Sequence, residues 1–234
     1  MNERIYIPVP CWNRKRVVEL CLPTMRDSKG SQDYLDIWND GSTEYDSEWL
    51  TQFGDHVEHS NCQRGVQVQR KAHFVKFSSE PTFTHMYLSD SDAFVDPLWR
   101  ERALEIQARY PHHIVCLYNT VAHTGMPFNV SRDNLTEDVF FTKYAPGISY
   151  LLTRANAMKV MAVLQHMAHF DWFIPSVLGH RCVVSRTSYV DHLGVGGDRH
   201  PEGVGPEGGD RATSPTPFLV AKREEFVEIL SRSP

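Results

Sequence analysis

Short apolar runs alternate along this chain with segments in which apolar residues recur at helical spacing, and this alternation constrains the fold most. Short apolar runs bounded by turn-forming residues are typical of buried strands. Strands that alternate with helices form a parallel or mixed sheet whose faces the helices cover. A chain of 234 residues suits one domain of this kind. We therefore expect an α/β fold in a single domain, with a mixed, mostly parallel sheet flanked by helices.

The apolar pattern and its breaks locate the expected elements. Strands are expected over residues 4–10, 34–38, 56–58, 85–88, 114–118 and 182–185. Helices are expected over residues 14–25, 47–53, 65–78, 97–109, 154–168 and 218–231. Residues 145–150 fit either a strand or a loop, and Pro8 and Pro10 should force the end of the first strand into a loop. The Gly- and Pro-rich stretch 194–217 is expected to be a functional loop or a mobile segment.

Composition and charge argue against several classes of protein. The formal net charge of -5 argues against a broad electrostatic surface for nucleic acid. No apolar run approaches the roughly 20 residues that span a bilayer, and no signal peptide is recognisable. The five cysteines are scattered without a CxxC pair, which indicates neither a disulfide framework nor a cysteine zinc site. A soluble, cytoplasmic protein is expected.

Acidic turns follow two of the expected strands. Asp90-Ser91-Asp92 closely follows the run that ends at Leu88, and Asn39-Asp40-Gly41-Ser42 follows the run that ends at Trp38. In parallel α/β sheets, ligands collect at the carboxyl ends of the strands. Two carboxylates two residues apart on such a loop can face one cation, and their hard oxygens suit Mg²⁺ or Mn²⁺. The alternative is a solvated acidic loop, because Asp and Ser favour turns in any case.

Taken in order, four segments resemble the nucleotide-sugar-binding half of GT-A glycosyltransferases, especially family 2. Residues 7–14 are similar to the opening strand of that family, residues 39–42 to its DDGS turn, residues 61–70 to its NxG…ARN segment, and residues 90–92 to its DxD motif. The resemblance covers roughly residues 4–105 and depends on order and spacing. It implies a GT-A-like, Rossmann-like fold and a nucleotide-sugar donor, with a UDP-sugar expected.

The resemblance assigns donor-site roles to several residues. It implies that Asp40 accepts a hydrogen bond from the nucleobase, with capping of its own turn as the alternative. Pro8 and Trp12 would shape the base pocket, and Asn13 belongs to the same strand-end segment of the donor site. Arg70 would steady the nucleotide or support the acidic loop.

A metal site is implied by the same resemblance. Asp92 would be the principal ligand of Mn²⁺ or Mg²⁺, and Asp90 would face the ribose or share the ion. Residues 189–197 resemble the closing HxG element of many GT-A enzymes, so His192 would complete the metal shell. Gly194 and the glycines after it would let backbone amides approach the diphosphate. The alternative for His192 is a packed or surface histidine.

A catalytic carboxylate is expected in the second half of the chain. Residues 169–173 are similar to the acidic ED-type motif, which supplies the base that deprotonates the acceptor hydroxyl in inverting members. Asp171 is the candidate, and a helix N-cap is its alternative role. Residues 144–150 resemble the family's segment in which a glycine approaches the donor sugar. About 1–118 would bind the donor, about 119–217 would hold the acceptor and catalytic groups, and 218–234 would form a terminal helix.

The expected function is metal-dependent, inverting transfer of a sugar of the hexosyl type from a UDP-sugar to an acceptor hydroxyl. The acceptor stays open between a glycan, a lipid-linked sugar, a protein, a small molecule and a hydroxymethylated DNA base. Basic residues near the strand ends either contact phosphate or form solvated helix faces; they are Arg14, Lys15, Arg16, Arg64, Arg70 and Lys71. The rival hypotheses are a nucleotidyltransferase, a non-catalytic nucleotide-sugar or carbohydrate-binding module and, last, a zinc hydrolase, for which no HExxH spacing is present.

Overall fold

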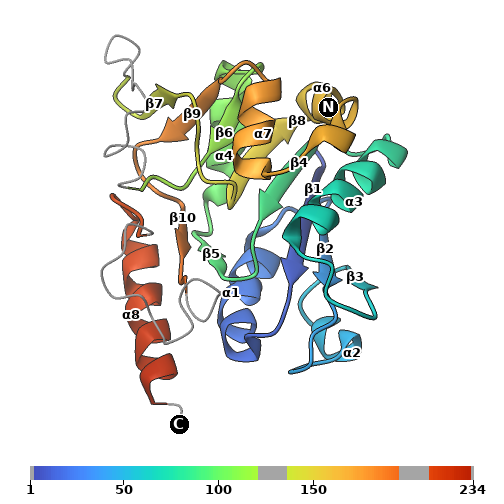
Figure 1. The fold of residues 1–234 in the computed structure, drawn as a ribbon. Helices are drawn as coiled ribbons and strands as arrows, with labels where there is room; N and C mark the ends of the chain where they lie inside the picture. Colours follow the sequence, from blue (N-terminus) through green and yellow to red (C-terminus); the bar gives the residue numbers. More distant parts are fainter. Residues whose placement is uncertain (1–2, 121–135, 195–210, 233–234) are drawn as a thin grey trace.

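A computed structural model describes residues 3–120, 136–194 and 211–232, which fold around a mixed eight-stranded sheet (Figure 1). Its strand order is β3-β2-β1-β4-β8-β6-β9-β7. Four neighbouring pairs in this order are parallel and three are antiparallel. The expected mixed, mostly parallel sheet is therefore confirmed. The strands are β1 (Ile5–Cys11), β2 (Tyr34–Asn39), β3 (His56–His59), β4 (His85–Ser89), β6 (Ile114–Cys116), β7 (Val139–Thr142), β8 (Ser149–Thr153) and β9 (Cys182–Ser185).

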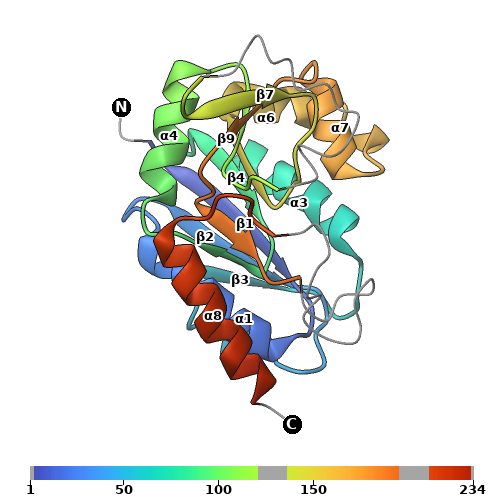
Figure 2. The same cartoon turned by 90° about the vertical axis from the view of Figure 1, so that its left-hand side faces the viewer.

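Helices cover both faces of this sheet (Figures 1 and 2). On one face lie α1 (Lys15–Ser28) and α4 (Trp99–Arg109). On the other lie α3 (Val66–Ser79) and α6 (Arg154–Met161), which pack against each other. The other α-helices of the described residues are α2 (Ser47–Leu50), α7 (Phe170–Val177) and α8 (Pro217–Ser231). No helix in the described ranges is both long and apolar enough to cross a bilayer.

A second, two-stranded sheet extends the fold beyond the main core. In it β5 (Ala93–Val95) pairs antiparallel with β10 (Val190–His192). The terminal helix α8 packs against this sheet and α1, which creates a small separate core of Val17, Cys21, Phe94, Leu193, Leu219 and Phe226. The sequence did not predict β5, because three residues directly after an acidic turn are too short to produce a readable alternation. This small sheet brings residues 93–95 and 190–192 together.

The first strand corrects the expectation that Pro8 and Pro10 end it. β1 continues to Cys11 and stays paired with β2 through its last residue, whereas its pairing with β4 stops at Tyr6. In a strand, the backbone N–H and C=O groups of every second residue face the same neighbouring strand. The carbonyl oxygen of Arg4 accepts from the start of β4, so Pro8 and Pro10, at even-numbered spacing from Arg4, also face β4. Because proline has no N–H to donate, the two prolines end only the β1–β4 ladder and leave β1–β2 intact.

Arg70 of α3 fills the gap that the prolines leave between β1 and β4. Its guanidinium donates to the backbone oxygen of Pro8 in β1 at 3.2 Å and to that of Ser89 in β4 at 2.6 Å. The side chain is fully buried. The guanidinium thus takes the place of the backbone hydrogen bonds that β1 and β4 do not make, and it separates the two strands at their carboxyl ends.

The second half of the chain differs most from expectation. The helix expected over 154–168 ends at Met161 and is followed by a 3₁₀ turn, Leu164–His166. In a 3₁₀ turn, side chains three residues apart point the same way, which lets Leu164 and Met167 both reach the core. The ambiguous segment 145–150 contributes only the start of β8, and β7 was not predicted. Most of the 194–217 stretch lies outside the described residues.

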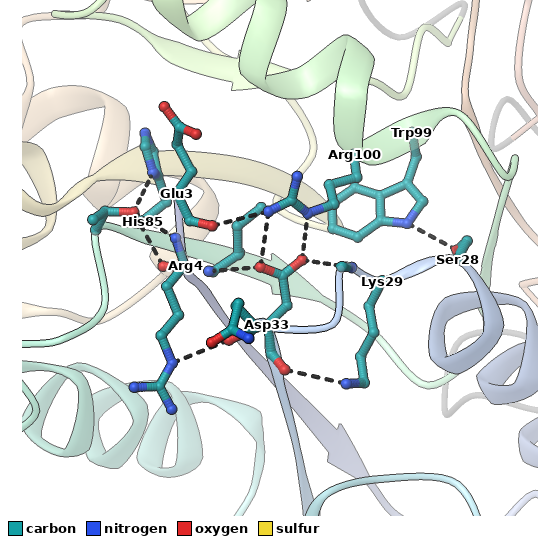
Figure 3. Close-up of polar contacts among 12 residues, drawn as sticks. Glu3, Arg4, Ser28, Lys29, Asp33, His85, Trp99 and Arg100 are labelled. Carbon is teal, nitrogen blue, oxygen red and sulfur yellow. Dashed lines mark hydrogen bonds and ion pairs between the residues drawn. The ribbon is translucent and has the colours of Figure 1, made fainter. Parts of the chain in front are cut away.

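A buried carboxylate ties the elements together at the opposite edge of the sheet, where the parallel strands begin (Figure 3). Asp33 accepts hydrogen bonds from the backbone N–H groups of Ile5 and Gly30, at 2.9 and 2.8 Å. Arg100 of α4 contacts both of its oxygens, at 2.6 and 3.2 Å. One side chain therefore links β1, the turn before β2 and α4.

Candidate functional site

A cavity of about 400 Å³ opens at the carboxyl ends of β1, β2 and β4. The acidic turns that the sequence predicts follow two of these strands, β2 and β4. The start of α3 and the end of β10 complete the wall. The lining residues are Pro10, Cys11, Trp12, Arg14, Asp40, Gln63, Gly65, Val66, Gln69, Asp90, Ser91, Asp92 and His192.

Asp92 lies between two cationic or potentially cationic groups at the edge of the cavity. Its Oδ2 is 2.6 Å from Nη1 of Arg14 and 3.0 Å from Nε2 of His192. The Asp92 side chain is only 6% exposed. Burial by itself raises the pKa of this carboxyl, but His192 and Arg14 outweigh burial and hold the pKa well below its usual range. The surroundings of Asp92 therefore stabilise its ionised carboxylate form.

The small sheet explains how His192 reaches Asp92 from the far end of the sequence. The β5–β10 register sets His192 opposite Ala93, the residue that follows Asp92. The backbone N–H of Leu193 also donates to the carbonyl oxygen of Asp92 at 3.0 Å. Backbone pairing thus fixes the distance between the imidazole and the carboxylate.

Asp90, the other carboxylate of the acidic loop, pairs with Arg70 at 2.6 Å. The Arg70 guanidinium lies 5.1 Å from the ring centroid of Phe170, within cation–π range. Burial raises the pKa of Asp90; Arg70 opposes this shift, and the nearby Asp92 charge adds to it. The two carboxylates of the loop are thus perturbed in opposite directions, a pattern that is common at functional sites.

Asp40 lines the cavity and also holds the start of α3. Its two carboxylate oxygens accept hydrogen bonds from the backbone N–H groups of Arg64 and Gly65, both at 2.8 Å. Gly65 is the N-cap residue of α3, so Asp40 stabilises the start of this helix, whereas Asn39 accepts from the N–H of Ser42 within the turn. Each carboxylate oxygen can accept a second hydrogen bond. A base-binding role for Asp40 stays a prediction.

The other predicted donor residues divide into those that line the cavity and those that support it. Trp12 is a lining residue, whereas Pro8 is not, and Pro10 lines the cavity in its place. Asn13 is not a lining residue either, and its Oδ1 accepts from the backbone N–H of Thr43 at 2.9 Å. Arg70 lies outside the lining, and so does Gly194, which adopts φ of 62°.

Asp171 lies in the first turn of α7 but outside the cavity lining. Its Oδ1 accepts a hydrogen bond from the backbone N–H of Gly147 at 2.9 Å. A Cβ on Gly147 would come within 2.1 Å of that oxygen, so only glycine allows this approach. Burial lowers the pKa of Arg70, and the negative charges of Asp90 and Asp171 oppose this shift. Asp171 therefore lies close enough to influence the arginine that pairs with the acidic loop.

Arg14 is the site residue that the sequence left least defined. Position and charge placed it among several basic residues with two alternative roles, and nothing in the sequence paired it with Asp92. Only the folded structure reveals its role. Arg14 adopts a left-handed backbone conformation just before α1, with φ of 58° and ψ of 45°, and its side chain pairs with Asp92. Within the described part of the chain, no group of three or more His, Cys, Asp or Glu side chains is arranged to hold a metal ion.

Comparison with solved structures shows a shared fold. The crystal structure of S. aureus TarS 1-349 matches with a TM-score of 0.59 and 11% identity, covering 80% of this chain and 59% of that one. S. aureus TarS 1-349 in complex with UDP-GlcNAc matches with a TM-score of 0.58 and 12% identity, covering 80% and 57%. S. aureus TarS 1-349 in complex with UDP matches with a TM-score of 0.60 and 11% identity, covering 80% and 59%.

The present chain thus spans less than two thirds of these TarS chains. At this level of identity the likeness establishes the fold, a mixed α/β fold of the GT-A-like type. No protein-family model matches the chain, and no curated protein sequence matches it.

Proposed function

We propose that this chain is a glycosyltransferase that moves a sugar, of the hexosyl type, from a UDP-sugar to an acceptor hydroxyl with the help of a divalent cation. The observation that carries the proposal is the 3.0 Å contact between His192 and Asp92 at a cavity that Asp40 also lines. Asp92 and His192, 100 positions apart in the sequence, meet there at the strand ends where α/β sheets bind ligands. The TarS complexes with UDP-GlcNAc and UDP, which share this fold, support a nucleotide-sugar donor.

The donor atoms around the acidic loop suit a divalent cation by their chemistry, although in the described residues they are not already arranged as a set of three ligands. Asp90 and Asp92 would offer carboxylate oxygens, the ligands that Mg²⁺ and Mn²⁺ prefer, and Nε2 of His192 already lies beside Asp92. When bound, the cation would supply a Lewis acid for the leaving diphosphate. The protein would orient the donor through Asp40 at the base and Trp12 beside it.

Asp171 is the base in this proposal. Its carboxylate would take the proton of the acceptor hydroxyl while the acceptor oxygen bonds to the anomeric carbon and the sugar–phosphate bond breaks. Such a direct displacement inverts the anomeric configuration and releases UDP. The N–H of Gly147 holds one Asp171 oxygen in place, which supports a fixed orientation for the base.

Binding of the donor nucleotide is the first test. We expect UDP with Mn²⁺ to raise the melting temperature by about 5–10 °C at 100 times its Kd, because ligand binding at that ratio adds about 2.7 kcal/mol to a domain of this size. ATP and inorganic phosphate serve as controls. A protein that no nucleoside diphosphate stabilises, with or without Mn²⁺, contradicts the proposal. UDP release from a UDP-sugar separates an enzyme from a binding module, and pyrophosphate release from UTP and a sugar phosphate would indicate a nucleotidyltransferase.

Asp171→Asn tests the base. Asparagine keeps an oxygen that accepts from Gly147 but cannot take a proton, so the local structure is preserved while catalysis is lost. We expect Mn²⁺-dependent UDP release, with water as the acceptor, to fall by about 10²–10⁴-fold, the usual range for removal of a general base. Affinity for UDP measured by calorimetry should stay at the wild-type value. Wild-type turnover in this variant would exclude Asp171 as the base.

A further inference from the structure

Two guanidinium groups face the acidic loop, and their surroundings differ. Arg70 is fully buried and is fixed by two backbone oxygens in addition to Asp90. The Arg14 side chain is 23% exposed and lines the cavity. On the loop it donates to the Asp92 carboxylate at 2.6 Å and to the Ser91 hydroxyl at 3.4 Å. Arg70 is therefore a structural cation, whereas Arg14 faces the space where a ligand would lie.

The backbone holds Arg14 in an uncommon conformation that points its side chain at the loop. Asn13 and Arg14 both have positive φ, 49° and 58°, which non-glycine residues rarely adopt. Hydrogen bonds between Asn13 and the turn after β2 maintain this geometry: the Asn13 N–H donates to Ser42 Oγ at 2.6 Å, and its Oδ1 accepts from Thr43. Arg14 is the N-cap residue of α1, yet its side chain makes no capping hydrogen bond. Strain of this kind concentrates at functional sites.

Arg14 and a divalent cation would compete for the same carboxylate. Oδ2 of Asp92 already accepts from Arg14 and lies 3.0 Å from His192. A cation held by Asp92 and His192 would share this carboxylate with the guanidinium, and like charges so close to each other repel. The guanidinium therefore has to move when the cation binds.

Charge balance indicates where it moves. The carboxylates of Asp90 and Asp92 are paired with the guanidiniums of Arg70 and Arg14, so these four side chains carry no net charge in the absence of a ligand. A divalent cation alone would leave an excess of two positive charges. The diphosphate of a nucleotide sugar carries about two negative charges, and a planar guanidinium is well suited to bind it through two hydrogen bonds.

We propose that Arg14 is an exchangeable counter-cation of Asp92, which it releases when the divalent cation and the nucleotide diphosphate bind together, and that Arg14 then binds the diphosphate. This inference rests on the proposed function and deepens it. It makes Arg14 a donor-binding residue whose removal has opposite effects on the two ligands. Cation binding alone becomes easier, because the competing charge is gone, while nucleotide binding becomes weaker.

The test is calorimetry on the full chain with Mn²⁺ alone and then with UDP at saturating Mn²⁺. We expect Arg14→Gln to tighten Mn²⁺ binding and to weaken UDP binding, each by about tenfold or more, the scale of one charge-assisted hydrogen bond. Arg16→Gln is the matched control, since it removes the same charge from an exposed position two residues further along α1 and should change neither affinity. Arg14→Lys keeps the charge and should give smaller changes, and it serves if Arg14→Gln melts too low for titration.

The outcomes separate the two proposals. If the wild-type protein binds UDP with Mn²⁺ but Arg14→Gln leaves Mn²⁺ affinity unchanged or lowers it, the exchange is wrong and the proposed function stands. If Mn²⁺ binding tightens while UDP binding does not change, Arg14 does not bind the diphosphate, and the proposal that it exchanges Asp92 for the diphosphate is wrong. If the wild-type protein binds no UDP under any condition, both the proposed function and the Arg14 exchange are wrong.

Discussion

Replacement of Asp92 by Asn should reduce Mn²⁺-dependent release of UDP from a UDP-sugar by about 10³-fold or more, the scale seen when one group that stabilises developing charge is removed. Asparagine has nearly the shape of aspartate but no charge, so Arg14 and His192 lose their common anion. The Asp92 carboxylate is also the principal ligand for the cation in the proposed function. The measurement is initial UDP release at saturating Mn²⁺, with the melting temperature followed in parallel.

Asp138→Asn supplies the control for this variant. Asp138 is likewise an ion-paired carboxylate, held by Arg102 and Arg109, and it is not a lining residue of the cavity. The same chemical change there should leave UDP release at the wild-type rate. If Asp92→Asn releases UDP as fast as the wild-type protein, the cation model is wrong.

The second large effect concerns stability. Asp33→Ala should lower the free energy of unfolding by about 3–5 kcal/mol, the cost of breaking a buried ion pair. The Asp33 side chain is fully buried, and its loss leaves the Arg100 guanidinium and the N–H groups of Ile5 and Gly30 without this acceptor (Figure 3). Urea unfolding followed by circular dichroism measures the change.

A surface ion pair provides the comparison for Asp33. Lys222 and Glu225 of α8 form a pair at 2.7 Å whose side chains are 33% and 50% exposed. Lys222→Met should cost no more than about 0.5 kcal/mol, because solvent screens such pairs. If Asp33→Ala lowers the free energy of unfolding by less than about 1 kcal/mol, the contacts of Asp33 do not stabilise this edge of the sheet.

The sequence predicted the parts of this molecule that depend on local pattern. Apolar runs located β1, β2, β3, β4 and β6 in the first half but not β5, and the acidic turns after Trp38 and Leu88 located the edge of the sheet at which the cavity lies. The parallel arrangement of β1, β2 and β4 brings these strand ends to one edge. That much of the candidate site follows from order along the chain.

The remaining features depend on contacts between distant residues, which no local pattern encodes. The Arg14–Asp92 pair joins residues 78 positions apart and requires a left-handed residue before a helix, a conformation that arginine does not signal. Similarly, the burial of Arg70 follows from a gap between two strands and not from its own helix. The end of α6 at Met161 follows from core packing, which overrides an uninterrupted helical pattern.

The prolines of β1 also limit how the strands beneath the candidate site can rearrange. Because Pro8 and Pro10 carry no amide hydrogen, β1 and β4 cannot zip together above Tyr6 in the absence of ligand. The gap between these strands, which the Arg70 guanidinium fills, is therefore fixed by the covalent chain and does not depend on a bound ligand. A rearrangement at this end of the sheet therefore cannot proceed by extension of the β1–β4 ladder through the two prolines.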